Sequence, residues 1–150
     1  MTGRPLLDRV FVPVASEEDA RTTARAAAPH LRESDGYAVV GHVIEKAGGA
    51  PDKASVEQRE RRAEDVFAVI GEEFAAADVP HECHLLYGTD VAERIIAAAG
   101  EHDADAIVFT PRGGSRWLRL LTGDVSLSLV TLADRPVVVL PDVEGGEADG

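Results

Sequence analysis

Five short apolar runs along the chain predict β-strands. Most of them are rich in β-branched or aromatic residues and are bounded by polar, glycine or proline positions. The runs are Val10–Val14, Tyr37–Ile44, Glu82–Tyr87, Ala106–Thr110 and Val137–Leu140. The first is apolar on both faces, which favours a central parallel strand, whereas the third alternates and fits a more exposed strand.

Amphipathic stretches between these runs predict helices. Ser16 and Asp90 are candidate N-caps followed by acidic residues in the first turn, and Gly100 is the expected C-cap of the helix that Asp90 begins. Two further stripes of apolar residues predict helices from Val56 onwards and over residues 125–133. Because strands and helices alternate, we expect an α/β fold: an open, five-stranded parallel sheet with helices on both faces.

Chain length and composition predict one domain. The chain has 150 residues, of which 45% are hydrophobic, so it can bury a core without disulfide or metal support. We expect a single domain over residues 1–141. The acidic, glycine-rich residues 142–150 are expected to form a disordered tail.

The charge limits the partners. A net charge of −12 disfavours nucleic acid and anionic membrane surfaces, because phosphates would meet a negative field. Only Lys46 and Lys53 are lysines, and this acidic, arginine-based composition resembles that of proteins from salt-loving archaea. With Cys83 as the only cysteine, no signal-peptide pattern and no run of about 18 apolar residues, we expect a cytoplasmic protein without a membrane span.

The stretch from Ala104 to Pro141 contains the parts of an anion-binding site. A predicted strand leads into a glycine-containing loop, and the loop ends at Gly123-Asp124, where a predicted helix begins. In doubly wound sheets, ligands bind at the carboxyl ends of the strands where the strand order reverses. This rule places the site at residues 13–16 and 110–114.

The sequence resembles the universal stress protein family over almost its whole length. The resemblance rests on residues 10–14, on His42-Val43 at the end of the second strand, on Gly88 and on residues 136–140. It implies a Rossmann-like sheet of the adenine-nucleotide α-hydrolase type. Many family members bind ATP through a signature of glycine, two residues, glycine, nine residues, and glycine followed by serine or threonine.

This chain departs from that signature. Gly113 and Gly123 keep the spacing of nine residues, but Thr110 replaces the first glycine and Asp124 replaces the terminal hydroxyl residue. Ala15 stands where ATP-binding relatives carry an aspartate that contacts the nucleoside. The resemblance still gives a set of candidate nucleotide-binding residues: Pro13, Val14, Ala15, Val43, Thr110, Arg112, Gly113, Gly123, Asp124 and Val125.

Charge in the loop has two opposed effects. Asp124 at a helix N-cap would accept the backbone N–H groups itself, so a triphosphate would meet a like charge. Arg112, Arg116 and Arg119 lie in the same loop without any acidic neighbour, and guanidinium groups suit phosphate. Surface arginines more often pair with carboxylates, here those of Asp124 or of neighbouring helices.

We expect the other residues with reactive side chains to have structural roles. On a strand, His81 and Cys83 point to one face and His84 to the other, so they do not converge on a metal, and we expect no metal site. Cys83 is expected to be a packed strand cysteine and His42 a structural histidine. No serine lies in a G-x-S-x-G elbow, and we expect no catalytic residues.

The last strand predicts self-association. The resemblance places it at a sheet edge and implies a homodimer formed by joining two such strands, bracketed by Pro136 and Pro141. The expected interface residues are Val137, Val138, Val139 and Leu140.

Three functions remain open. The first hypothesis is a cytoplasmic, homodimeric regulatory protein of the stress response, with weak or absent ATP binding and no cofactor. The alternative is a protein that binds ATP or AMP, with Mg²⁺, or a slow ATPase, using Gly113, Gly123 and the nearby arginines. A subunit that docks on a transporter or a kinase is a third possibility.

Overall fold

Five parallel strands form one open sheet at the centre of the protein. The computed structural model describes residues 5–46, 53–111, 125–141 and 143. The strand order is β3-β2-β1-β4-β5, and every pair is parallel. The strands are β1 (Arg9–Pro13), β2 (Tyr37–Glu45), β3 (His81–Gly88), β4 (Ala106–Phe109) and β5 (Val137–Val139). The predicted α/β fold with a parallel sheet is confirmed.

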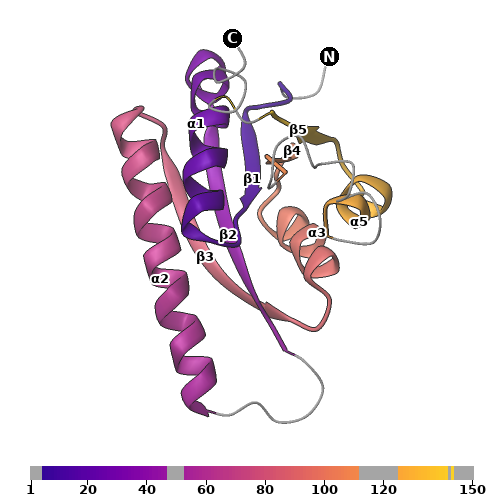
Figure 1. Ribbon diagram of the computed structural model, residues 1–150. Coiled ribbons are helices and arrows are strands. Elements are labelled where there is room, and N and C mark those ends of the chain that lie inside the picture. The colour runs from indigo at the N-terminus through magenta and orange to yellow at the C-terminus, as the bar shows by residue number, and fades with distance from the viewer. Residues whose placement is uncertain (1–4, 47–52, 112–124, 142, 144–150) are drawn as a thin grey trace.

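Helices cover both faces of the sheet (Figure 1). One face carries α1 (Glu17–Ser34) and α2 (Lys53–Ala76), and the other carries α3 (Val91–Glu101) and α5 (Val125–Leu132). Consecutive residues of β1 point to opposite faces, so Val10 and Val12 pack under α1 and α2 while Phe11 packs under α3. All three are fully buried, which explains the continuous apolar run in the sequence.

Both predicted N-caps are present. The Ser16 hydroxyl accepts the Asp19 N–H at 3.0 Å, and Asp90 Oδ1 accepts the Glu93 N–H at the same distance. The predicted C-cap at Gly100 is wrong, because α3 continues to Glu101.

Gly100 instead provides space for a side chain from another element. A Cβ atom there would lie 3.2 Å from Nη2 of Arg135. Arg135 reaches this position to donate from Nη1 to the carbonyl oxygens of Ala99 and Ala104, at 3.3 and 2.7 Å. The left-handed residue that follows the helix is Asp103, with φ 56°. The glycine therefore serves tertiary packing rather than helix termination.

The strand order reverses direction at β1. The chain leaves β1 for β2 on one side and later returns to β4 on the other, so β1 and β4 are neighbours whose connections diverge. β1 is followed by Val14 and Ala15, and β4 is followed by Thr110. The crevice between these ends is where the fold rule for doubly wound sheets places a ligand.

No helix in the described part of the chain is long and apolar enough to cross a membrane.

Candidate functional site

A cavity of about 170 Å³ opens at the carboxyl ends of β1, β2 and β4. Six of the ten residues predicted from the sequence line it: Pro13, Val14, Ala15, Val43, Thr110 and Val125. The other four, Arg112, Gly113, Gly123 and Asp124, lie outside the described residues, as do Arg116 and Arg119. The structure thus brings the described part of the predicted set to one place.

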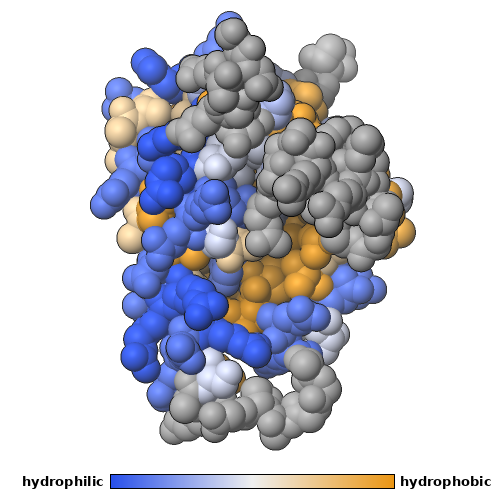
Figure 2. All heavy atoms as spheres, viewed as in Figure 1, coloured by the Kyte–Doolittle hydropathy of each residue, from blue (hydrophilic) through white to orange (hydrophobic). Residues whose placement is uncertain are grey.

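Apolar side chains from α3, α5 and β4 form much of the cavity wall. They are Val91 and Ile95 of α3, Leu129 of α5 and Phe109 at the end of β4. Figure 2 shows an apolar area over α3 on this side of the molecule, next to the hydrophilic surface of α2. Walls of this kind suit the faces of an aromatic ring better than they suit a charged group.

One polar side chain in this wall is buried without a partner. Thr110 is 3% exposed, and its hydroxyl makes no hydrogen bond within the described parts of the chain. A buried hydroxyl without a partner costs about 1–3 kcal/mol of free energy. A ligand with a donor or an acceptor at this point would recover that cost, so Thr110 favours an occupied cavity.

A carboxylate lies on another part of the wall. Asp19, in the first turn of α1, accepts the Ala15 N–H on Oδ2 at 2.7 Å and the Thr23 hydroxyl on Oδ1 at 3.4 Å. The sequence places an alanine, Ala15, where ATP-binding relatives carry an aspartate, but the fold brings Asp19 to the same segment from one helical turn away. The cavity is therefore not free of negative charge.

The backbone of β2 extends past the end of β1 into this region. β1 and β2 pair as far as Pro13 and Gly41, and the Gly41 carbonyl then accepts the Val14 N–H at 2.9 Å. Residues two apart on a strand direct their backbone groups to the same side. The N–H and C=O of Val43 therefore face the cavity side, beyond the last β1 residue in register with β2, and can bond to a ligand.

His42 holds Val14, one of the cavity-lining residues, from outside the cavity. Its ring is buried, and Nδ1 donates to the Val14 carbonyl at 2.9 Å, while Phe67 packs edge-on at 6.3 Å between ring centroids. Burial lowers the pKa of His42, and the bond to the Val14 carbonyl opposes this shift in part. His42 does not line the cavity. These contacts fit the structural role expected from the sequence.

The strand histidines and the cysteine separate as the sequence predicts. Cys83 packs against the core under α1 and α2, and His81 lies against Phe74 on the same side, with ring centroids 5.6 Å apart. His84 lies on the opposite face, beside His102. Burial, and next the charge of Glu82, raise the pKa of the Cys83 thiol to about 11. A raised pKa keeps the thiol protonated at neutral pH, which fits the packed strand cysteine expected from the sequence.

Several cavity residues escaped sequence reasoning. They are Asp19, Gly41, Val91, Ile95, Phe109 and Leu129, whereas Pro111 lies within the predicted range 110–114. The sequence identifies Asp19 only as a favourable charge in the first turn of a helix. It identifies the α3 residues only as core positions. No local signal separates a core residue from one at the rim of a cavity, because both satisfy the same hydrophobic pattern.

The fold and the place of the cavity define a class: α/β proteins that bind a ligand at a topological switch point. The model of the Universal stress protein family matches residues 7–141, and the chain belongs to this family. Among curated proteins, none matches this sequence.

Solved structures of universal stress proteins share the fold. One from Burkholderia pseudomallei is 22% identical with a TM-score of 0.72, covering 93% of this chain and 99% of that one. One from Archaeoglobus fulgidus, in complex with dAMP, is 23% identical with a TM-score of 0.64, covering 91% and 99%. A third, in complex with cAMP, is 17% identical with a TM-score of 0.67, covering 88% and 97%.

Proposed function

We propose that this universal stress protein is a cytoplasmic regulatory protein that binds an adenosine nucleotide weakly and has no catalytic residues of its own. The observation that carries the proposal is the cavity at the ends of β1 and β4, with the buried, unpartnered hydroxyl of Thr110 among the described residues of its wall. Two relatives of the same fold were solved with dAMP and cAMP, which supports an adenine-containing ligand.

The cavity suits the base better than the phosphates. Its volume of about 170 Å³ is below the roughly 300–1,000 Å³ of sites that enclose a whole drug-sized ligand. Apolar walls at Ile95 and Leu129 can cover the faces of a purine, and the backbone of Val43 can bond to its edge. We infer that the base and the adjoining sugar enter and that the phosphates remain outside.

The weak binding of nucleotide proposed here has an electrostatic cause. The Asp19 carboxylate, which accepts the Ala15 N–H, places negative charge in the cavity wall and repels the phosphates of a nucleotide whose base is bound there. The sequence adds Asp124 at the position of the signature hydroxyl, and the chain carries a net charge of −12. Each additional phosphate therefore costs more, and we expect AMP to bind at least as well as ATP.

A binding experiment tests the proposal. Protein purified without a tag is denatured, and released nucleotide is sought by mass spectrometry; calorimetry then follows titration with AMP and with ATP and Mg²⁺. Stoichiometric ATP in the purified protein would contradict weak binding. No heat of binding with AMP or ATP at millimolar concentration would contradict nucleotide binding itself.

Thr110→Val identifies the site. We expect AMP affinity to fall several-fold while the free energy of unfolding stays equal or rises, because the hydroxyl lost has no partner among the described residues. Thr89→Val, at an exposed threonine before α3, is the matched control and should change neither quantity. Equal AMP affinities of both variants would place the ligand elsewhere.

A gain-of-function variant tests the cause of the weakness. Asp124→Ser removes a carboxylate and restores the hydroxyl residue of the ATP-binding signature. We expect ATP with Mg²⁺ to bind about tenfold more tightly to this variant, which corresponds to about 1.4 kcal/mol. Unchanged ATP affinity would show that the carboxylate of Asp124 does not limit binding.

We also propose that the protein is a homodimer joined along β5. This strand lies at one edge of the sheet, beside β4. Val137, Val138 and Leu140 pack partly against the core, and Val139 remains 39% exposed. Val139 is thus the most exposed of the four interface residues expected from the sequence, and it lies at the strand edge. Exposed apolar residues of α5 lie nearby in the chain: Val125, Val130 and Leu132.

Light scattering tests the dimer. Val139→Lys places a charge on the edge strand and should convert the dimer into a monomer, because a charged edge resists strand pairing. Leu6→Lys is the matched control, since Leu6 is a similarly exposed apolar residue (48%) before β1. A wild-type protein that is monomeric at working concentration, or a Val139→Lys variant that stays dimeric, would contradict the proposal.

A further inference from the structure

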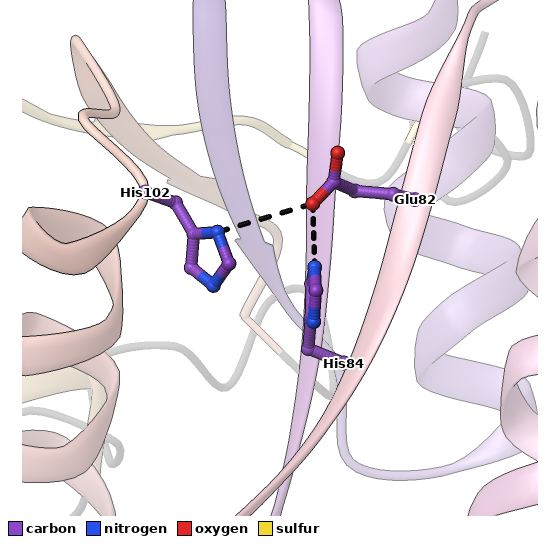
Figure 3. Close-up of side chains that lie close together, drawn as sticks. All are labelled: Glu82, His84 and His102. Atoms are coloured by element: carbon purple, nitrogen blue, oxygen red, sulfur yellow. Dashed lines mark hydrogen bonds and ion pairs between the residues drawn. The ribbon is translucent and has the colours of Figure 1, made fainter.

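Three side chains with metal-binding atoms converge on the α3 side of the sheet. Glu82 and His84 come from β3, and His102 is the residue that ends α3 (Figure 3). Glu82 Oε2 lies 2.5 Å from Nε2 of His84 and 3.9 Å from Nδ1 of His102. One donor atom from each residue lies within 4.8 Å of the others. None of the three lines the cavity described above.

These separations are close to those of a tetrahedral metal site. Zinc bonds of about 2.0–2.1 Å to nitrogen and oxygen place two ligand atoms about 3.3 Å apart. The distances of 2.5 and 3.9 Å from Glu82 Oε2 lie on either side of that value. Small rotations of the two imidazoles, whose centroids are now 4.3 Å apart, would open the space between the three donors.

The Glu82 carboxylate is already oriented for metal binding. Glu82 Oε1 accepts the Tyr37 hydroxyl at 2.7 Å, so the Tyr37 bond fixes one oxygen and Oε2 faces the histidines. A second bond partner that holds a ligating carboxylate in place is a common feature of metal centres.

The backbone of the third candidate ligand, His102, is also held in place by a hydrogen bond. The His102 carbonyl accepts Nε of Arg9 at 2.6 Å, which fixes the backbone at the end of α3. The side chains of Glu82, His84 and His102 are 35%, 37% and 22% exposed, so an ion can reach them from solvent. Arg9, stacked over the Tyr37 ring at 5.2 Å, adds a positive charge nearby that lowers the affinity for a cation.

We propose that Glu82, His84 and His102 bind one divalent transition-metal ion, Zn²⁺ in the first place, with water completing the coordination. Two imidazoles and one carboxylate are the donors that Zn²⁺ and its neighbours in the first transition row prefer, whereas Mg²⁺ and Ca²⁺ prefer oxygen ligands alone. The ion would tie the edge strand β3 to the end of α3. The site is independent of the nucleotide cavity and of its proposed function.

Titration calorimetry with Zn²⁺ tests the site on tag-free protein at pH 7.5, where imidazoles are largely neutral. We expect one Zn²⁺ per chain and no binding of Mg²⁺ under the same conditions. His84→Gln and His102→Gln should each weaken Zn²⁺ binding by roughly tenfold or more, since each removes a ligand. His30→Gln, at an exposed histidine of α1, is the matched control and should bind Zn²⁺ like the wild type.

Co²⁺ absorption spectroscopy, combined with a check of folding, tests the site even if a substitution lowers stability. Co²⁺ bound to wild-type protein should give visible absorption bands that Glu82→Gln removes, while far-ultraviolet circular dichroism shows that the variant is folded. Absence of Zn²⁺ binding by the wild type would overturn the proposal. It would also be overturned if Zn²⁺ bound equally to His84→Gln, His102→Gln and the control, because the ion would then use other residues.

Discussion

His42 shows how one buried side chain links the sequence to the site. Its ring donates to the Val14 carbonyl and thereby holds the segment that follows β1, next to the cavity. A protonated imidazole would have to remain charged in a buried position, which is why burial lowers the pKa of His42. The residue is therefore a link between pH and the stability of the cavity wall.

We predict that His42 makes the fold lose stability in mild acid. Its folded pKa lies below the unfolded value of about 6.5, so as the pH falls below 6.5 the unfolded chain takes up the proton first. The free energy of unfolding should drop between pH 7.5 and 5.5 more steeply in the wild type than in His42→Gln, as measured by urea denaturation. His30→Gln should follow the wild type. Parallel curves for wild type and His42→Gln would exclude this contribution.

At the scale of the element, β2 shows a glycine that serves packing. Glycine in a strand interior usually weakens the strand, but β2 runs without a break through Gly41 from Tyr37 to Glu45. A Cβ atom at Gly41 would lie 2.4 Å from Cζ of Phe11, which is fully buried under α3. The glycine is needed because the aromatic ring of the neighbouring strand occupies that space.

Two alanine substitutions should have opposite effects. Gly41→Ala should lower the free energy of unfolding by about 1–3 kcal/mol, because the added methyl group overpacks against Phe11. Gly71→Ala, inside α2, should raise it by about 0.5–1 kcal/mol, since its Cβ would meet only His81 Nε2 at 3.5 Å and alanine favours the helix. Urea denaturation of both variants checks the signs. A neutral or stabilising Gly41→Ala would show that Phe11 can move aside.

For the whole molecule, charge is the dominant feature. The chain has 27 acidic residues against 15 lysines and arginines. Surface ion pairs such as Arg25 with Glu73, at 3.2 Å, offset only part of this excess. Self-repulsion in dilute buffer therefore opposes folding, and salt reduces it by shortening the screening length.

We predict that salt stabilises the protein. Raising KCl from about 0.1 to 1 M shortens the Debye length from about 10 to 3 Å, and a gain of about 1 kcal/mol would raise Tm by about 3 °C for a domain of this size. Thermal denaturation followed by circular dichroism measures this. A comparison with an uncharged osmolyte separates screening from general exclusion effects. A Tm that does not change, or that falls, would show that repulsion is unimportant here.

The elements and their order could be predicted because their signals are local. β1 was expected at Val10–Val14 and is found at Arg9–Pro13, and the caps at Ser16 and Asp90 are present as expected. Strand, helix and cap patterns depend on residues a few positions apart, and strict alternation then leaves few possible topologies. Strand boundaries shifted by one residue, as at the end of β4, because hydrogen-bonded pairing with the neighbouring strand, rather than composition, decides where a strand ends.

The amino-acid sequence by itself determined the α/β class, the switch point and the glycine spacing of the predicted anion site. Only the tertiary structure decided which distant residues meet. Asp19, Val43 and Thr110 come together because strand order and register bring three elements to one edge. The same holds for Glu82, His84 and His102, since the last lies at the end of a helix packed against the sheet. Periodicity records which face a residue occupies, whereas contacts between distant segments depend on how the faces are assembled.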